Sequence, residues 1–267
     1  MRFVLAGAVL MLSTLAHAET VSLYAAGSLK AALTEVAAAF QKNGGGKMRV
    51  EATFGPSGLL REKIEQGEPA HVFASADTGH PKRLVDQGRA GGPLTVFARN
   101  QLCALARPDL SVTSDGLLDA MLDPNLRLGT STPKADPAGD YAFALFTKAE
   151  ALKAGARAAL EGKALQLTGG PNSEKAPPGR NPYAWVMETR KADLFLTYCT
   201  NALLAQKEMP SVQIVHVQAA LNVGADYGMI VLKDAPAAAA DLARFILGGD
   251  AQAILTKHGF GYGEQGK

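Results

Sequence analysis

The chain has 267 residues, a formal net charge of +2 at pH 7, and 47% hydrophobic against 19% charged residues. This length can bury a substantial core, either as one large domain or as two smaller ones. The near-neutral charge gives no electrostatic support for non-specific binding to nucleic acid or to a membrane surface. We therefore expect no nucleic-acid partner.

Residues 1–18 have the pattern of a secretory signal peptide. Arg2 precedes an apolar run at residues 3–15, and the triplet Ala16-His17-Ala18 has small residues at both outer positions. The apolar run is short for a membrane span, which needs about 20 residues. No cysteine follows it as an attachment point for lipid, so the sequence predicts cleavage after Ala18 and a free protein of the bacterial periplasm.

Extended and helical patterns alternate along the rest of the chain. Strands are predicted at residues 21–24, 48–54, 71–77, 94–108 (one long strand or two in line), 125–131, 164–169, 193–198, 211–218 and 227–234. Helices are predicted at residues 29–40, 55–67, 79–88, 115–122, 137–152, 181–192, 199–206, 237–247 and 251–259. This alternation is typical of βαβ units around a mainly parallel sheet, which is an α/β fold.

The number of βα units is too large for one small sheet, and no change in composition marks a flexible linker. Two lobes joined by crossing strands would accommodate them. The candidate crossings are residues 94–106 and 223–233, which are extended and flanked by turn residues. We expect residues 19–98 and 225–267 to form the first lobe and residues 99–224 the second.

The chain contains two cysteines, Cys103 and Cys199. An oxidising compartment allows a disulfide between them, but two buried free thiols fit the sequence equally well. The five histidines show no ligand-like spacing, so we expect no bound cation and no resident cofactor.

Three predicted strand-to-helix turns carry small or hydroxyl residues: Gly27-Ser28, Pro56-Ser57-Gly58 and Pro137-Ala138-Gly139. Taken alone, each could be an ordinary helix cap, as Ser28 would be at the start of the first helix. Helix N-termini also bind anions through unpaired N–H groups and a partial positive charge. If these turns converge on one cleft, neutral donors could hold an oxyanion there.

Catalytic motifs have weaker support. The sequence lacks the nucleophile-elbow, zinc-protease, phosphate-loop and dinucleotide-binding patterns. Ser75, Asp77 and His80 could be imagined as a triad, but closing a strand and capping the next helix is the simpler role for the first two. Cys199 could be a nucleophile, although nothing nearby in the sequence would lower its pKa.

Several stretches resemble the periplasmic molybdate- and tungstate-binding proteins of ABC importers. They are "AAGSL" (25–29), "FGPSGLLREKIEQGEPAHVFASAD" (54–77), "DPAGDYA" (136–142), "ADLFLTY" (192–198) and the terminal "GFGY" (259–262), in the family's order over nearly all of the mature chain. The resemblance implies a two-lobe α/β fold of the type II periplasmic binding-protein kind, with the ligand in the interlobe cleft. It also implies a monomer that delivers its ligand to a permease in the inner membrane.

Site residues carry over from the matching motifs. Ser28 and Ser57 would donate hydroxyl and backbone N–H groups, Ala138 a backbone N–H, and Tyr198 its phenol. A further backbone N–H would come from the start of the helix before the tyrosine strand, where Arg180 and Asn181 lie. Molybdate and tungstate offer only acceptors, so a pocket made of donors suits them.

Some residues depart from the family pattern and leave other ligands open. Asp140 follows Ala138 closely, Arg180 lies after an inserted loop, and Cys199 follows the tyrosine. One alternative keeps the fold but binds another small oxyanion or an organic acid through Arg180 or Asp140. Two others are an enzyme that uses Cys199 and a periplasmic sensor that presents its ligand to a receptor.

Overall fold

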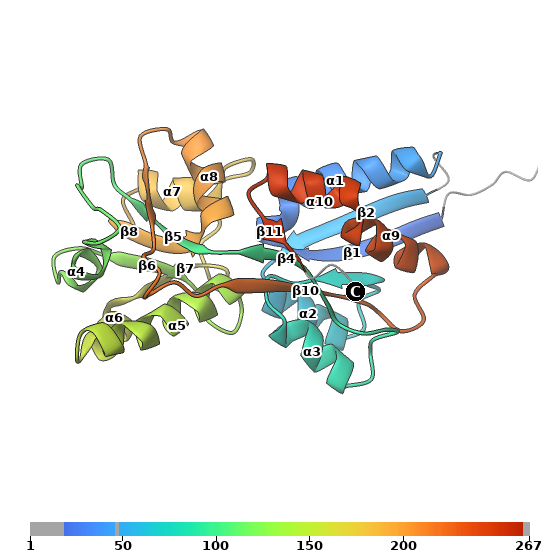
Figure 1. Cartoon of the computed structure of the whole chain (residues 1–267), viewed down its shortest axis with the longest axis horizontal. Helices are drawn as coiled ribbons and strands as arrows, with labels where there is room; N and C mark the ends of the chain where they lie inside the picture. Colours follow the sequence, from blue (N-terminus) through green and yellow to red (C-terminus); the bar gives the residue numbers. More distant parts are fainter. Residues whose placement is uncertain (1–18, 46–47, 264–267) are drawn as a thin grey trace, which may run out of the picture.

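The computed structural model describes residues 19–45 and 48–263, which form two lobes side by side, each built on one β-sheet (Figure 1). The predicted signal peptide at residues 1–18 lies outside the described residues. The two-lobe α/β architecture expected from the sequence is confirmed.

The first lobe contains a six-stranded sheet. Its strands are β1 (Glu19–Ala26), β2 (Met48–Gly55), β3 (Val72–Ala74), β4 (Thr95–Asn100), β10 (Ala225–Val231) and β11 (Gly261–Tyr262). They lie in the order β11-β4-β10-β3-β1-β2. β1 runs parallel to β2 and β3, whereas β10 is antiparallel to β3 and β4, and β11 is antiparallel to β4.

Helices cover both faces of this sheet (Figure 1). One face carries α1 (Lys30–Asn43), α9 (Ala237–Leu247) and α10 (Gly249–Lys257), and the other carries α2 (Ser57–Glu65) and α3 (Gly79–Asp86). Alternate side chains of β1 serve the two faces, as strand geometry requires. Leu23 packs in the same cluster as Leu33 of α1, whereas its neighbour Tyr24 packs with Leu60 of α2.

The second lobe contains a five-stranded sheet in the order β7-β6-β8-β5-β9. Its strands are β5 (Leu102–Ala106), β6 (Leu128–Ser131), β7 (Leu165–Thr168), β8 (Leu194–Tyr198) and β9 (Gln213–His216). β6 is parallel to β7 and β8, whereas β5 is antiparallel to β8 and β9. Both sheets are thus mixed rather than mainly parallel, because the strands next to the interlobe crossings run against their neighbours.

The second sheet is also covered on both faces (Figure 1). α5 (Pro137–Leu152) and α6 (Ala156–Lys163) pack together with α4 (Leu117–Leu122), and α7 (Pro182–Glu188) packs with α8 (Cys199–Glu208). The sequence did not predict α6, because only Ala156 and Leu160 of this short helix are buried. No helix in residues 19–45 and 48–263 has the length and apolar character that a membrane span requires.

The chain passes between the lobes twice. It leaves the first sheet after Asn100 and enters the second at Leu102, and it returns between His216 and Ala225. Asn100 pairs with Ala225, so the first sheet extends beyond the predicted boundary at residue 98. The two crossings therefore meet at this pair.

A disulfide joins Cys103 of β5 to Cys199, the first residue of α8. The sequence left open a disulfide or two buried free thiols, and the structure contains the disulfide. Its partners are 96 residues apart in the chain. Closing a loop of that size in the unfolded chain stabilises the folded state by about 4–5 kcal/mol in the chain-entropy model.

Candidate functional site

A cleft of about 1320 Å³ lies between the two lobes. The first lobe lines it with the ends of β1 and β2 and the starts of α1 and α2. The second lobe lines it with most of residues 168–176, the start of α7, and residues along the length of α8. Five of the predicted site residues line it: Ser28, Ser57, Arg180, Asn181 and Tyr198. The sixth, Ala138, is 0% exposed and is not among the described residues that line the cleft.

Ser28 lies in a single 3₁₀ turn, Gly27–Leu29, between β1 and α1. α1 begins at Lys30, and neither the turn nor the helix is capped by a side chain. The expectation that Ser28 caps the helix is therefore wrong. Its Oγ instead lies 3.0 Å from the phenolic oxygen of Tyr227, and the side chain lines the cleft.

Ser57 is the first residue of α2 and is 0% exposed. Its Oγ accepts a hydrogen bond of 3.1 Å from the backbone N–H of Ala76. A serine hydroxyl has one hydrogen and two acceptor lone pairs, so the hydrogen of Ser57 stays available as a donor. α2 also has no side-chain cap, because its N-cap residue is Pro56.

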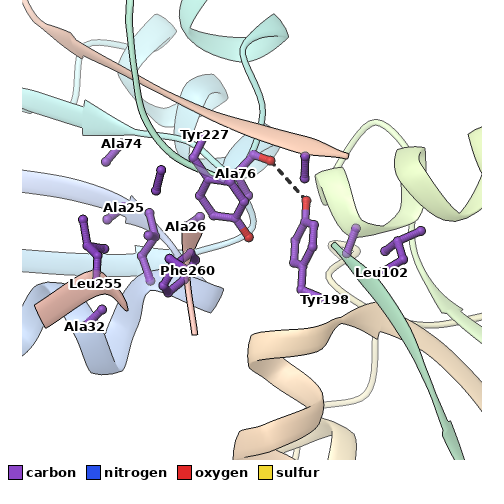
Figure 2. Packing of buried hydrophobic residues seen from close by; sticks show 14 of the residues in the cluster. Ala25, Ala26, Ala32, Ala74, Ala76, Leu102, Tyr198, Tyr227, Leu255 and Phe260 are labelled. Carbon is purple, nitrogen blue, oxygen red and sulfur yellow. Dashed lines mark hydrogen bonds between the residues drawn. The ribbon is translucent and has the colours of Figure 1, made fainter. Parts of the chain in front are cut away.

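Tyr198 ends β8 and reaches across to the first lobe (Figure 2). Its phenol donates a hydrogen bond of 3.1 Å to the carbonyl of Ala76. Burial raises the pKa of Tyr198 well above its ordinary value, so the phenol stays protonated. A second interlobe bond of 2.9 Å runs from the N–H of Gly58 to the carbonyl of Ala135, so the lobes are in direct contact beside the cleft.

The second-lobe turn at Asp136–Ala138 differs from the expectation. The N–H of Ala138 donates to Asp136 Oδ1 at 3.0 Å, so the predicted anion donor already serves as the capped start of α5. The capping carboxylate itself lines the cleft. Burial raises the pKa of Asp136 to about 6, against the opposing hydrogen bonds from Ala138 and Ser131.

Arg180 and Asn181 line the cleft but have partners of their own. The guanidinium of Arg180 pairs with Glu208, at 2.6 Å from Nε, and with Glu188. The N–H of Asn181 donates to Glu208 Oε2 at 2.7 Å, while its side-chain oxygen caps α7 by accepting from the N–H groups of Tyr183 and Ala184. The backbone N–H of Asn181 and two nitrogens of Arg180 are therefore already engaged in this arrangement.

Asp140 is not among the described residues that line the cleft. Its carboxylate accepts the N–H of Lys134 at 2.9 Å, and Lys134 has a φ of 67°. Burial raises the pKa of Asp140, partly offset by that hydrogen bond. Asp140 therefore holds the left-handed turn whose next residue, Ala135, contacts α2.

Tyr227 and Asn100 were missed by sequence reasoning. Tyr227 is 0% exposed, contacts Ser28, and packs against the ring of Tyr198 with centroids 5.5 Å apart (Figure 2). Asn100 donates to the phenolic oxygen of Tyr227 at 3.1 Å. Ser28 and Tyr227 are 199 positions apart in the chain, and no motif linked them.

The groups considered for catalysis do not form a nucleophilic site. Cys199 is in the disulfide with Cys103, so it is not a free thiol. Ser75 donates to Asp77 Oδ1 at 2.7 Å, and Asp77 accepts from the N–H of His80 at the start of α3. Within the described part of the chain one cluster has metal-ligand types, Cys103, Cys199 and His216, but its two sulfurs are bonded to each other.

The sequence pattern of bacterial extracellular solute-binding proteins matches residues 21–261. The chain belongs to this family. Its members are substrate-binding proteins rather than enzymes.

Proteins of similar sequence include an uncharacterized protein and molybdate-binding proteins. An uncharacterized protein of Pasteurella multocida is 40% identical over 185 residues, covering 68% of this chain and 75% of its own. The molybdate-binding protein ModA of Azotobacter vinelandii is 30% identical over 142 residues, covering 52% of this chain and 54% of its own. The match to this molybdate-binding relative thus spans about half of each chain.

Solved structures share the fold at low sequence identity. The periplasmic molybdate-binding protein of Azotobacter vinelandii superimposes with a TM-score of 0.71 at 20% identity, covering 91% of this chain and 100% of its own. The sulfate-binding protein SubI of Mycobacterium tuberculosis superimposes with a TM-score of 0.72 at 17% identity, covering 91% and 86%. The same fold therefore accompanies different anions.

Proposed function

We propose that this protein captures molybdate, and also tungstate, in the interlobe cleft and delivers it to an ABC permease. The observation that carries the proposal is the pair of first-lobe helix starts, both without a side-chain cap, that bring Ser28 and Ser57 to one cleft. Such starts attract anions through their N–H groups and partial positive charge. Molybdate and tungstate are tetrahedral dianions that offer only acceptors, which suits a site of donors.

The hydroxyl groups at the cleft also support a site made of hydrogen-bond donors. Ser57 accepts from Ala76, which leaves its hydrogen for a ligand. The protonated phenol of Tyr198 now donates to the carbonyl of Ala76, and an anion between the lobes would replace that acceptor. Hydrogen bonds to a charged acceptor contribute about 1.5–3 kcal/mol each, so a handful can sustain tight binding.

We expect binding to reduce the size of the cleft. Small-molecule sites usually measure about 300–1,000 Å³, whereas this cleft measures about 1320 Å³. The lobes already touch beside the cleft through Tyr198 and Gly58, and we expect its walls to move closer together around a tetrahedral anion. Differential binding to the closed state would drive that closure, and the permease would recognise the closed lobes.

The cellular setting follows from the family and from the N-terminal pattern. We propose export by the signal peptide with cleavage after Ala18, and action in the periplasm as a monomer. The anion is the cargo, and no resident cofactor is part of the proposal.

A second candidate ligand is an oxyanion or small organic acid that carries a proton. Asp136 favours it, because an ionised carboxylate at the cleft repels a dianion but accepts a hydrogen bond from a protonated ligand. Arg180 gives less support to a carboxylate ligand than its sequence position suggested, because Glu188 and Glu208 already neutralise it.

Titration calorimetry on the mature chain, residues 19–267, tests the assignment with molybdate, tungstate, sulfate and phosphate. We expect micromolar or tighter binding of the first two and weaker binding of the others. Micromolar binding of sulfate or phosphate without binding of molybdate would overturn the assignment. The double variant Ser28→Ala/Ser57→Ala is the control, because it must lose binding if the anion occupies this cleft.

A further inference from the structure

A buried chain of hydrogen bonds ends at Ser28. Asn100 Nδ2 lies 2.8 Å from Thr200 Oγ1 and 3.1 Å from the phenolic oxygen of Tyr227. That phenolic oxygen lies 3.0 Å from Ser28 Oγ. Asn100 and Tyr227 are 6% and 0% exposed, so water does not compete for the two bonds that Asn100 makes, whereas Ser28 is half-buried at the cleft.

The direction of the chain follows from the backbone next to it. The N–H of Gln101 donates to Asn100 Oδ1 at 2.9 Å. A backbone N–H can only donate, so the oxygen of the Asn100 amide must face Gln101. Its NH₂ group therefore faces Thr200 and Tyr227, and it supplies one hydrogen to each.

The same direction passes through Tyr227 to Ser28. The phenolic oxygen of Tyr227 accepts from Asn100, which leaves the single hydrogen of the phenol for Ser28 Oγ. Ser28 Oγ is then an acceptor toward Tyr227, and its own hydrogen points elsewhere. The serine lines the cleft, so a ligand there meets a hydroxyl that is set to donate.

We propose that Asn100 and Tyr227 are positioning residues that fix the hydroxyl of Ser28 as a donor to the anion. The proposal rests on the proposed anion binding in the cleft. It assigns a role in ligand selection to two residues that do not line the cleft. Fully deprotonated oxyanions gain most from this polarity, because they need a donor from every hydroxyl that they meet.

A double-mutant cycle tests the coupling, with titration calorimetry of molybdate as the measurement. Ser28→Ala is expected to weaken binding about 10- to 100-fold, because it removes a donor to a charged acceptor. Tyr227→Phe keeps the ring contacts with Tyr198, Phe97 and Phe260 and is expected to weaken binding about 2- to 10-fold. In the Ser28→Ala background the Tyr227→Phe change should have no further effect.

Reversing the polarity of the chain is the sharper test. Asn100→Asp places an acceptor where the NH₂ group was, so Tyr227 would donate to Asp and accept from Ser28, and the serine would no longer donate to the ligand. We expect molybdate binding about 10- to 100-fold weaker than in the wild type. Adding Tyr227→Phe should then recover part of the affinity, because Ser28 loses the acceptor that captures its hydrogen.

The outcomes distinguish a failure of the hydrogen-bond chain from Asn100 through Tyr227 to Ser28, here called the relay, from a failure of the proposed ligand. Equal effects of Tyr227→Phe in the wild-type and Ser28→Ala backgrounds, or no recovery in Asn100→Asp/Tyr227→Phe, would overturn the relay. If the wild type binds sulfate or phosphate instead of molybdate, the proposed function fails, and the same cycle is measured with that anion. Binding of no oxyanion overturns both. Tyr24→Phe is the matched control, because its phenol is bonded to Glu68 on the other face of the first sheet, and melting curves exclude misfolded variants.

Discussion

The helices that begin at the cleft differ between the two lobes. In the first lobe, α1 with its 3₁₀ turn and α2 have no side-chain cap. In the second lobe, α5 is capped by Asp136 and α7 by Asn181, and a proline follows each capping residue, whereas α8 has no side-chain cap. A proline at the first helical position has no N–H, and the capping oxygen satisfies the donors that come next.

This difference assigns separate tasks to the two walls of the cleft. The helix starts of the first wall have no side-chain caps, and Ser57 and Ser28 add hydroxyl groups there, although the N–H of Gly58 already donates to the carbonyl of Ala135. On the second wall, side chains cap the starts of α5 and α7, and the carboxylates of Asp136 and Glu208 line the cleft. We therefore expect an anion to meet the hydroxyl groups of the first lobe directly, whereas the N–H groups of Gly58, Ala138 and Asn181 would have to exchange their present partners for it.

A pair of serine variants, one on each wall, is expected to show the largest effect. Ser57→Ala should weaken oxyanion binding about 10- to 100-fold, because it removes a hydroxyl donor to a charged ligand. Ser173→Ala should change the affinity less than about 3-fold, although Ser173 also lines the cleft and also accepts a backbone N–H, from Gly170 at 2.9 Å. Calorimetry of both variants measures the difference, and equal losses would contradict the division of tasks.

Gly58 allows the uncapped start of α2 to meet the second lobe. A Cβ at this position would lie 2.3 Å from the carbonyl oxygen of Lys134 and 2.8 Å from that of Ala135. Gly58→Ala should therefore keep the lobes apart and weaken binding about 5- to 50-fold, in line with the cost of overpacking. Small-angle scattering should show a larger radius of gyration.

Gly55→Ala provides the comparison for that variant. Its added Cβ would meet Leu60 at 3.5 Å, which is ordinary van der Waals contact. We expect little change in radius or affinity for Gly55→Ala. An unchanged radius for Gly58→Ala would show that this interlobe contact does not limit closure.

Local patterns predicted most of the fold. The helical pattern of "PAGDYAFALFTKAEAL" predicted α5 at the bounds that the structure has, Pro137–Leu152. The sequence missed α6, which buries few residues, and overestimated the parallel character of the sheets. Strand direction depends on how the chain crosses between lobes, and no local pattern encodes that.

The site was predictable in its members more than in their bonds. Ser28, Ser57 and Tyr198 were placed in one cleft from their motifs, and all three line it. The bond between Ser28 and Tyr227 depends on tertiary contacts, which local sequence patterns do not reveal. The sequence analysis also did not foresee that the N–H of Ala138 donates to the side chain of Asp136. The "DP" before Ala138 was nevertheless a signal, because an N-cap aspartate followed by proline takes up the donors of its own helix start.

Removing the charge from the second wall should strengthen binding. Asp136→Asn keeps an oxygen to cap α5 and removes the carboxylate, so we expect molybdate affinity to rise about 3- to 10-fold above pH 7, as one removed like charge at partial screening allows. In the wild type the affinity should rise as the pH falls through about 6, because Asp136 becomes neutral there. Calorimetry across this range measures both, and Asn at 136 should flatten the pH dependence.

The same carboxyl group should affect stability in a defined direction. The folded pKa of about 6 lies above the ordinary value of 3.8, so the unfolded state releases this proton first as pH rises. The free energy of unfolding should therefore fall between about pH 4 and pH 6, by about 1–3 kcal/mol from this group. Asp136→Asn should lack this decrease in urea denaturation, and an unchanged profile would argue against a strained carboxylate at the cleft.

Arg180 is expected to show the smallest effect. Its guanidinium is paired with Glu188 and Glu208, so it adds little net charge to the second wall. Arg180→Ala should weaken molybdate binding less than about 3-fold, mainly because the freed carboxylates repel the anion. A loss of molybdate affinity of about 10-fold or more would instead show that Arg180 exchanges its two glutamate partners for the ligand. Arg157→Ala is the control and should leave the affinity unchanged. Arg157 pairs with Glu161 on α6, so its removal tests the loss of an arginine ion pair that does not line the cleft. That result would give the second lobe a binding role that its capped helix starts do not provide.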